Sequence, residues 1–499
     1  MGIKRFYATK DNTITNAYAN NLTTRGTGSN MGASDILEVF NLYAQSSTSS
    51  QEASRILIDF PVIGTTTTSI SGSRDEGEIP LSGAVNFYLR LYDAPHSTTT
   101  PTDFTLVASA ISSSWTEGIG LDMENYTDLG ASNWLENTAS SNDWKNEGGD
   151  FLTGTAAGQL GNTLAPSTKQ TFSTGLEDLH MDVTAQMEEW LNTNTSSYGF
   201  GVYLTGSQEL SGSTTSYYTK RFFARGSQYF FSRPVIEARW DDARSDNRGD
   251  FYASSSLVSA DDNLNTLYFY NRVRGTLKNI PTLTNDFMLV TLHANALTSS
   301  LSSSFSASLA YINGQNLTGV YTASVYMSTT ASVVYDVWST GASQPADDGD
   351  RDTQYFTGSI EVNRFDDRGD DEEPVYVCNI TNLKKEYSVK ENARFRLFVR
   401  DKNWSPNVYT VATKTATSVT VPNIYYKLYR VVDELTIVNY GTGSTSEPAH
   451  TKLSYDISGS YFNFDMSILE SDFKYGLKFL YKYGTAYKEF DEVFTFRVG

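Results

Sequence analysis

Clustered carboxylates are the residues of this chain that could most directly bind a metal ion. One group is Asp347-Asp348-Gly349-Asp350, and the other begins with Asp366-Asp367-Arg368-Gly369-Asp370. Carboxylate oxygens are the ligands that Ca²⁺ prefers in proteins. The candidate Ca²⁺ ligands are the aspartates of both groups: Asp347, Asp348, Asp350, Asp366, Asp367 and Asp370. Neither group has EF-hand spacing and arginines lie among the acids, so solvated loops are the competing interpretation.

The other reactive side chains do not form a pattern that predicts catalysis. The four histidines are scattered, and none lies in an HExxH or His-x-His arrangement that would bind zinc. Gly-x-Ser-x-Gly does not occur in a strand–turn–helix context. Cys378 follows the strand-like segment 374–377, which favours a buried thiol. Two Arg-Gly-Asp tripeptides, 248–250 and 368–370, match an adhesion motif, but three residues are a weak signal. We therefore expect no catalytic residues and no enzymatic activity.

Composition favours a β protein and makes nucleic acid an unlikely partner. The 499 residues suggest about three domains, and 32 Tyr, 27 Phe and 36 Gly suit strands joined by turns. With 57 Asp and Glu against 38 Lys and Arg, the chain should be repelled by phosphate backbones, so nucleic acid is not an expected partner. The N-terminus has no apolar signal core and the chain has a single cysteine, which predicts assembly in a reducing cytoplasm. No stretch reaches 18 consecutive apolar residues, so a membrane span is not expected.

The elements that position these groups are mostly strands with alternating apolar and polar residues. In the first region, residues 1–240, strands are predicted at 35–43, 54–60 and 86–93. One short helix is predicted near 183–191 with Asp182 as its N-cap, because apolar residues recur there at helical spacing. An insertion rich in Gly, Asn and Trp occupies about 121–175. The polar run 241–250 is predicted to be a linker or an exposed loop.

Two further β-sandwiches are predicted after this linker. The second region, 245–380, holds several strand-like segments about ten residues apart, and Trp338 is expected to anchor its core. The third region, 381–499, contains the clearest period of two, in segment 393–400. The predicted fold class is therefore all-β, with an N-terminal jelly roll followed by two immunoglobulin- or fibronectin-like sandwiches and one short helix.

Several short motifs of the first region resemble the DNRLRE-type β-sandwich, a jelly-roll module related to carbohydrate-binding modules. The matching segments are 11–14, 30–39, 115–117, 181–184 leading to Trp190, 198–200, 221–225 and 233–238. The segment Ala224-Arg225-Gly226 departs from the serine and arginine–glutamate that this family usually carries. The whole chain also resembles virion structural proteins of large marine tailed phages, including those of cyanobacteria, on the basis of segments 23–30, 395–405 and 455–466.

The resemblance to carbohydrate-binding modules implies a possible sugar site. Sugar rings stack on exposed aromatic side chains, and Trp115, Trp134 and Trp144 lie in or near the insertion. They are the candidate glycan-binding residues, although tryptophan is more often a core residue.

These observations predict a non-enzymatic structural component of a tailed-phage virion. Expected places are the tail, neck, baseplate, fibre base or capsid decoration, and the expected partners are other virion proteins and further copies of the chain in a symmetric assembly. A glycan-binding adhesin or receptor-binding protein that contacts host surface sugars is the alternative. A polysaccharide-degrading enzyme is the third possibility.

Overall fold

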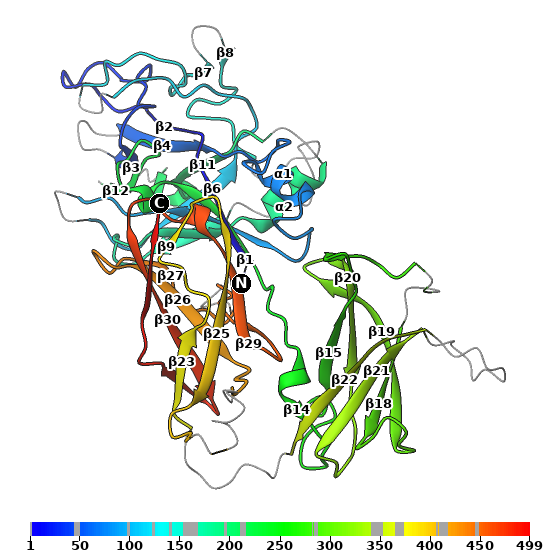
Figure 1. The fold of residues 1–499 in the computed structure, drawn as a ribbon. Coiled ribbons are helices and arrows are strands. Elements are labelled where there is room, and N and C mark those ends of the chain that lie inside the picture. The colour runs from blue at the N-terminus through cyan, green and yellow to red at the C-terminus, as the bar shows by residue number, and fades with distance from the viewer. Residues whose placement is uncertain are drawn as a thin grey trace. The chain divides into compact units, whose positions relative to one another are not determined.

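The computed structural model describes residues 2–43, 50–96, 100–121, 125–138, 142–152, 168–193, 197–209, 216–281, 283, 288–340, 353–364, 374–405, 408, 418–444 and 449–499. The chain forms two compact units (Figure 1). The N-terminal unit is Ile3–Arg239, and the C-terminal unit is Trp240–Gly499 with residues 1–2. The end of the first predicted region, residue 240, adjoins this division.

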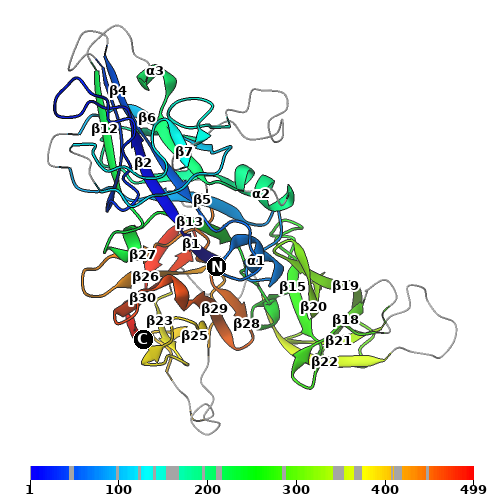
Figure 2. The same ribbon diagram turned by 90° about the horizontal axis from the view of Figure 1, so that it is seen from above.

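The N-terminal unit contains two antiparallel sheets. The small N-terminal sheet has the order β1 (Gly2–Tyr7), β13 (Val235–Trp240), β5 (Asn86–Leu91), β10 (Leu179–Asp182). The large N-terminal sheet has the order β12 (Ser216–Phe223), β3 (Ile36–Tyr43), β4 (Gln51–Asp59), β11 (Phe200–Leu204), β6 (Phe104–Ala110), β9 (Thr168–Phe172), and β2 (Lys10–Thr15) also pairs with β4. Figure 2 shows β12, β4, β2 and β6 of this sheet at the upper left of the view. A hairpin of β7 (Glu136–Thr138) and β8 (Asn142–Asp143) lies in the insertion.

Three α-helices occur in the described residues, all in the N-terminal unit: α1 (Ile70–Asp75), α2 (Thr184–Thr193) and α3 (Gly206–Glu209). The predicted helix corresponds to α2, which buries Met187 and Trp190. The prediction of a single helix was wrong, because α1 and α3 are too short to show a helical period in the sequence. Asp182 accepts a hydrogen bond from the Thr184 amide (2.9 Å), so it supports the first turn from just outside the helix.

The middle sheet of the C-terminal unit surrounds one apolar core. Its order is β14 (Phe251–Tyr252), β22 (Gln354–Asn363), β21 (Val333–Ser339), β18 (Met288–Ala294), β19 (Ser302–Ile312), β20 (Gln315–Val325), β15 (Asn265–Tyr270). A small hairpin of β16 (Arg272–Val273) and β17 (Thr276–Leu277) follows β15. The Trp338 ring lies 5.6 Å from the Phe269 ring in the core, so the prediction that Trp338 anchors this region is confirmed.

The last part of the C-terminal unit is a sandwich of two sheets. The small C-terminal sheet has the order β23 (Tyr376–Ile380), β25 (Asn392–Asp401), β29 (Gly459–Asp465), β28 (Ser454–Asp456). The large C-terminal sheet has the order β24 (Glu386–Tyr387), β32 (Phe494–Val498), β30 (Lys474–Tyr483), β26 (Ile424–Arg430), β27 (Thr436–Val438), with β31 (Ala486–Glu489) paired to β30. Stacked rings join the two sheets, since Phe462 of β29 lies 4.2 Å from Tyr426 of β26.

The polar run 241–250, predicted to be a linker or an exposed loop, is mostly half-buried and makes specific contacts. It contains the short 3₁₀ turn η2 (Asn247–Gly249). Two further 3₁₀ turns, η1 (Phe230–Ser232) and η4 (Met466–Ile468), lie elsewhere in the chain. Ser245 forms a parallel bridge with Tyr455 of β28. The side-chain oxygen of Asn247 accepts a hydrogen bond from the Thr266 amide of β15 (2.9 Å). Polar residues of this segment therefore have specific partners in two strands of the C-terminal unit.

The described chain is all-β apart from its short helices, as predicted. The sandwich and barrel-like sheets follow from the period-two patterns, because alternate residues of each strand turn toward a core. In β25, for example, Phe395 and Leu397 are buried while Arg394 is exposed.

Candidate interaction surfaces

The three tryptophans that we considered as candidate glycan-binding residues lie in the protein core, which is the more common place for this residue. Trp115, Trp134 and Trp144 belong to one buried cluster with Ile14 and Leu57, on the large N-terminal sheet. Two of the indole N–H groups are also engaged, because Trp115 donates to the Tyr198 carbonyl and Trp144 to the Asn133 carbonyl, both at 2.9 Å. Stacking on a sugar requires an exposed ring face, and these side chains do not have one. Their role is to pack the insertion onto the sheet.

The other residues considered as site candidates are either not described by the structure or buried. The candidate Ca²⁺ ligands Asp347, Asp348, Asp350, Asp366, Asp367 and Asp370 lie outside the described residues, as does the second Arg-Gly-Asp tripeptide. Within the described part of the chain, no group of three or more His, Cys, Asp or Glu side chains is arranged to hold a metal ion. Cys378 is buried, and burial raises the pKa of its thiol well above the usual range. The first tripeptide has its Arg248 side chain buried against Asp336, so this arginine is not available to a receptor.

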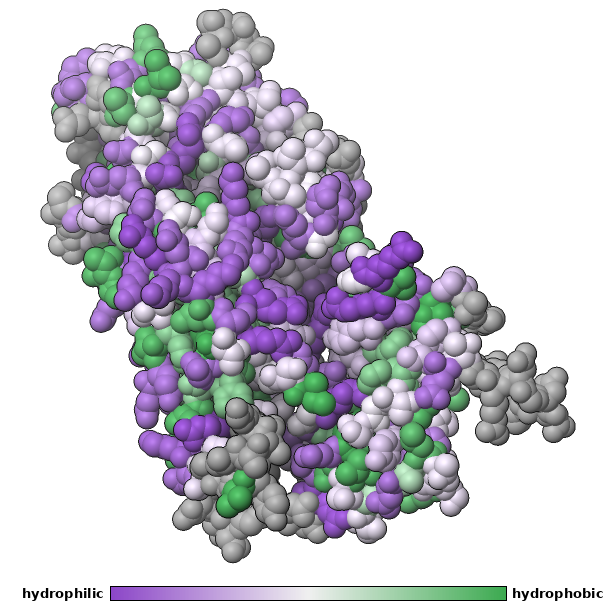
Figure 3. Space-filling model, in the orientation of Figure 1, coloured by the Kyte–Doolittle hydropathy of each residue, from purple (hydrophilic) through white to green (hydrophobic). Residues whose placement is uncertain are grey.

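Exposed aliphatic side chains gather on two loops of the N-terminal unit. They form what we call the aliphatic patch: Leu22, Ile119, Leu121 and Leu129, with exposed fractions from 63 % to 84 %. Figure 3 shows hydrophobic side chains gathered at the top of the view, over loops coloured blue and cyan in Figure 1. Single exposed leucines are common, but a group of them on adjoining loops is typical of a contact surface.

Hydrogen bonds fix the loops that carry the aliphatic patch. The Asn30 side chain, fully buried, donates to the carbonyls of Glu117 (2.6 Å) and Ser132 (2.8 Å). Its side-chain oxygen accepts from the amides of Gly32 (3.1 Å) and Gly120 (3.0 Å). Every hydrogen-bonding position of this amide is therefore used to join the two loops. A patch on such a base loses little conformational entropy when it binds a partner.

Two glycines let the loops close around Asn30. Gly118 has φ +83°, a left-handed conformation that favours glycine, and an added Cβ would lie 2.2 Å from the Asn30 side-chain oxygen. An added Cβ at Gly130 would lie 2.8 Å from the Cβ of Asn30. The Gly-rich sequence here therefore serves a close approach between loops and not flexibility.

The buried side chain of Asp11 and its backbone amide make hydrogen bonds beside the same loops. The Asp11 carboxylate accepts a hydrogen bond from the Arg225 amide (2.6 Å), and the Asp11 amide donates to Glu117 (2.8 Å). Burial is the main cause that raises the pKa of Asp11, to about 7, while the Arg225 amide acts in the opposite direction. The Glu117 carboxylate is paired with the Arg225 guanidinium at 2.6 Å.

A basic face lies on the small C-terminal sheet. Outward residues of β25 alternate with its buried residues, and Arg394 and Arg400 point away from the core together with the partly exposed Phe398. Lys402 follows the strand, is 54 % exposed and lies 4.0 Å from the carboxylate of exposed Asp491. Its amide donates to the carbonyl of exposed Val375 (2.8 Å). We call Val375, Phe398, Arg400 and Lys402 the basic face; it combines cationic and apolar side chains.

The sequence carries a charge asymmetry that strand patterns do not reveal. Residues 381–499 hold 16 Lys and Arg against 13 Asp and Glu, whereas residues 1–240 hold 14 against 25. Residues 241–380, which include Val375, hold 8 Lys and Arg against 19 Asp and Glu, so only the part of this face on β25 lies in a region with a small basic excess. The aliphatic patch belongs to an anionic part of the chain. Segment 117–130 has four acidic and no basic residues in the sequence.

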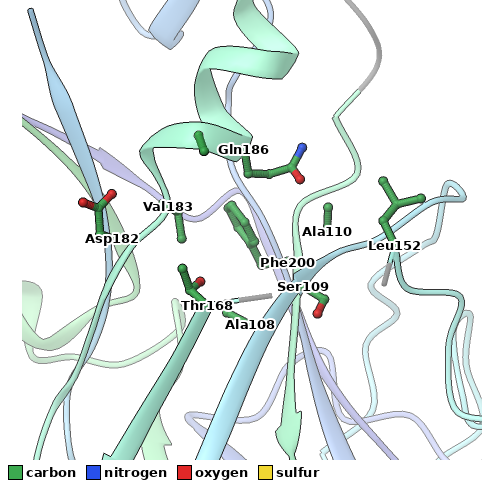
Figure 4. A pocket seen from close by; sticks show the side chains of 10 residues that line it. Ala108, Ser109, Ala110, Leu152, Thr168, Asp182, Val183, Gln186 and Phe200 are labelled. Atoms are coloured by element: carbon green, nitrogen blue, oxygen red, sulfur yellow. The ribbon is translucent and has the colours of Figure 1, made fainter. Parts of the chain in front are cut away.

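A small pocket of the N-terminal unit lies where α2 meets the large N-terminal sheet (Figure 4). Its lining includes Ser109, Thr168, Val183, Gln186 and Phe200, and its volume is about 30 Å³. This volume suits a water molecule and is far below that of a site for an organic ligand. The pocket therefore does not suggest a substrate.

No helix in the described ranges is long and apolar enough to cross a membrane.

Comparisons with known proteins give no family for the chain. No family model matches it, and no curated protein matches it. Among solved structures, the fibronectin(III)-like modules of Clostridium thermocellum CbhA are 8 % identical, with 52 % of this chain and 90 % of that chain covered and a TM-score of 0.14. A DUF4785 family protein of Legionella pneumophila is 7 % identical, with 96 % of this chain and 86 % of that chain covered and a TM-score of 0.13. Likeness at this level has no bearing on function.

Proposed function

We propose that the chain is a non-enzymatic structural component of a tailed-phage virion that acts by binding other virion proteins. The aliphatic patch carries this proposal, because its side chains are exposed on loops that buried Asn30 holds in place. A rigid loop with apolar side chains is suited to docking on another protein surface. The sequence resemblance to structural proteins of marine tailed phages supports the virion as the setting.

Mass spectrometry and labelling of purified phage particles test this function. The chain should be present in particles purified through a density gradient, in a copy number that fits a symmetric tail, neck, baseplate, fibre or capsid position. Antibody labelling should then place it at one such position. Presence in the infected-cell lysate together with absence from purified particles would contradict the proposal.

Glycan binding is a second candidate function, supported by a residue other than the buried tryptophans. Tyr229 is 55 % exposed, and its ring packs edge-on against Phe223 at 5.3 Å. Its amide donates to the Ser227 hydroxyl (3.2 Å), which helps to hold the backbone. A held aromatic ring with a free face is suited to stacking on a sugar.

A glycan array probed with the full chain and with Tyr229→Ala tests this candidate. Binding to a host envelope sugar that is lost in Tyr229→Ala would support it, with Tyr217→Ala as a control at another exposed tyrosine. Equal binding by wild type and Tyr229→Ala, or no binding by wild type, would argue against it.

A further inference from the structure

We propose that Lys220 and Asp93 of the N-terminal unit form an isopeptide bond, an amide between the lysine amine and the aspartate carboxyl group that links the two sheets covalently. The Lys220 Nζ donates a hydrogen bond to Asp93 Oδ1, so the two reacting groups are already in contact. Lys220 belongs to β12 of the large N-terminal sheet, and Asp93 follows β5 of the small N-terminal sheet. This inference goes beyond the proposed function and does not depend on it, because the bond lies within a single chain.

The burial of Lys220 distinguishes this ion pair from other lysine ion pairs. Its side chain is 0 % exposed, whereas five other paired lysines in the described part of the chain keep 14 % to 57 % of their side chains exposed. The rings of Phe172 and Phe222 lie 5.4 Å and 5.2 Å from Nζ and form apolar walls, and the Gly175 carbonyl accepts a second hydrogen bond (2.9 Å). Burial is the main cause that lowers the pKa of Lys220, while Asp93 acts in the opposite direction. The neutral, nucleophilic form of this amine is therefore easier to reach than at a surface lysine.

The presence of a lysine at this position is a second argument, because other buried ion pairs of the chain use arginine. Arg5 is paired with buried Glu237, and its side chain is 4 % exposed. Arg248 is paired with buried Asp336, and its side chain is 9 % exposed. A guanidinium keeps its charge and does not attack a carboxyl group, whereas a buried lysine amine loses its proton readily. The desolvation of two buried charges can exceed their mutual attraction, and a neutral amide removes both charges.

Backbone hydrogen bonds hold the two reacting groups together independently of their own contact. Segment 92–94 runs beside β12, where the Ala94 amide donates to the Arg221 carbonyl (3.1 Å). The Asp93 amide donates to the Asp178 carboxylate (2.8 Å), which fixes the backbone of the reacting aspartate. An amine and a carboxyl group held in this way react as parts of one molecule, with a much higher effective concentration than two groups that must collide.

The reaction releases one molecule of water and needs no further reagent. The Lys220 ammonium transfers one proton to the Asp93 carboxylate, and the neutral amine then attacks Cγ of Asp93. A C–N bond forms, the nitrogen gives up a second proton, and a C–O bond breaks as the oxygen leaves with both protons as water. The proton transfer is direct, since the nearby His96 ring, 4.0 Å from Asp93 Oδ1, already accepts the Arg221 amide at Nε2 (3.2 Å). The Asp93 side chain is 22 % exposed, so the water can reach solvent.

The bond supplies a covalent crosslink in a chain that has no cysteine pair. Cys378 is the only cysteine of the sequence, so no disulfide can form within the chain. The isopeptide bond closes the loop between residues 93 and 220 and restricts the unfolded state in the way that a disulfide does. The N-terminal unit should therefore resist heat and denaturant more strongly than its noncovalent contacts alone allow.

Mass spectrometry of the purified full chain under denaturing conditions tests the bond. The intact mass of wild type should be lower by one water molecule than the mass calculated from its sequence. A tryptic digest should yield a branched peptide that joins Lys220 to Asp93 and is not cleaved after Lys220. A wild type with its full calculated mass, or a loss of water located at other residues, overturns the inference.

Two variants remove one reacting group each. Lys220→Arg keeps the cation and Asp93→Ala removes the carboxyl group, and both should have the full mass calculated from their sequences. The matched control is the exposed pair of Lys10 with Asp59 (3.0 Å), in which the lysine side chain is 38 % exposed. Lys10→Met should lose one water molecule as wild type does.

Gel electrophoresis after boiling in detergent gives an independent result. Wild type should migrate faster than Asp93→Ala, because a covalently closed loop limits the extension of the unfolded chain. A loss of water that persists in Asp93→Ala would overturn the assignment to this pair. The mass of wild type decides the question even where a variant does not fold. Its result is also separate from the presence of the chain in virions, so this inference and the proposed function can fail independently.

Discussion

The Arg248 guanidinium lies 2.6 Å from the Asp336 carboxylate, on the core side of the middle sheet. Asp336 is fully buried between Val334 and Trp338 of β21, and the Trp338 indole N–H donates to it (2.7 Å). The arginine comes from η2, in the segment whose other residues bond to Tyr455 and Thr266. A buried ion pair thus attaches to the sheet a segment that the sequence predicts to be a linker or an exposed loop.

Removing one partner of this pair should destabilise the C-terminal unit strongly. Arg248→Met leaves the Asp336 carboxylate buried without its cation, and such losses cost about 3–5 kcal/mol. Urea denaturation of the full chain followed by circular dichroism measures the change in the free energy of unfolding. The double variant Arg248→Met with Asp336→Leu should recover much of the loss, since no charge is then left alone. Equal stability of wild type and Arg248→Met would refute the ion pair.

Asn30 should be important for the loops that present the aliphatic patch. Asn30→Ala leaves the amides of Gly32 and Gly120 and the carbonyls of Glu117 and Ser132 without their partner in a buried site. Each such group costs about 1–3 kcal/mol, so we expect a marked fall in thermal stability and faster hydrogen exchange at Gly120. Asn21→Ala, at an exposed asparagine that also bonds locally, is the control and should change stability little. Unchanged exchange at Gly120 in Asn30→Ala would count against this role.

Asp11 should make stability fall as pH rises. Its pKa is raised to about 7 in the folded chain, above the unfolded value near 4, so the folded state holds a proton that the unfolded state releases between these values. The protonated acid favours folding below the unfolded pKa, and this contribution is lost as pH rises through 7. Asp11→Asn keeps an acceptor for the Arg225 amide and should be more stable than wild type at about pH 8, with little difference at about pH 4. Parallel melting-temperature profiles for the two proteins would contradict the assignment.

Truncation should lower the free energy of unfolding strongly at a buried tryptophan and hardly at all in the exposed patch. Trp134→Ala empties part of the core between the insertion and the large N-terminal sheet, and large-to-small changes of this kind cost about 3–5 kcal/mol. Ile119→Ser, in the patch, should change the free energy of unfolding by less than about 0.5 kcal/mol. Differential scanning calorimetry of both variants separates the two roles. A stable Trp134→Ala would mean that this tryptophan is not a core residue.

Sequence periodicity predicted strands and helices well where the burial of a residue depends on its neighbours along the chain. Segment 393–400 alternates cleanly, and β25 (Asn392–Asp401) buries Phe395 and exposes Arg394, as a period of two requires. The predicted helix was displaced by only two residues at its end, because Met187 and Trp190 recur at helical spacing. Side chains whose partners are local in sequence were therefore the predictable ones.

Positions set by distant partners were the ones that the sequence did not reveal. Trp134 packs against Arg55, whose guanidinium lies 5.2 Å from its ring, and composition cannot say that an insertion folds back on this strand. Arg248 belongs to a polar run, and its burial depends on Asp336 in another strand. Nothing in the sequence indicates that the segment with Ile119 and Leu129 adjoins the loop around Asn30; the hydrogen bonds of Asn30 join the two.

A reconstruction of the intact phage particle that contains this chain is the most direct test of the account. It should show the chain as a repeated part of the particle, with Ile119 and Leu129 of each copy covered by a neighbouring protein. A particle without the chain, or one in which the aliphatic patch of every copy is open to solvent, would contradict a role in assembly through this surface.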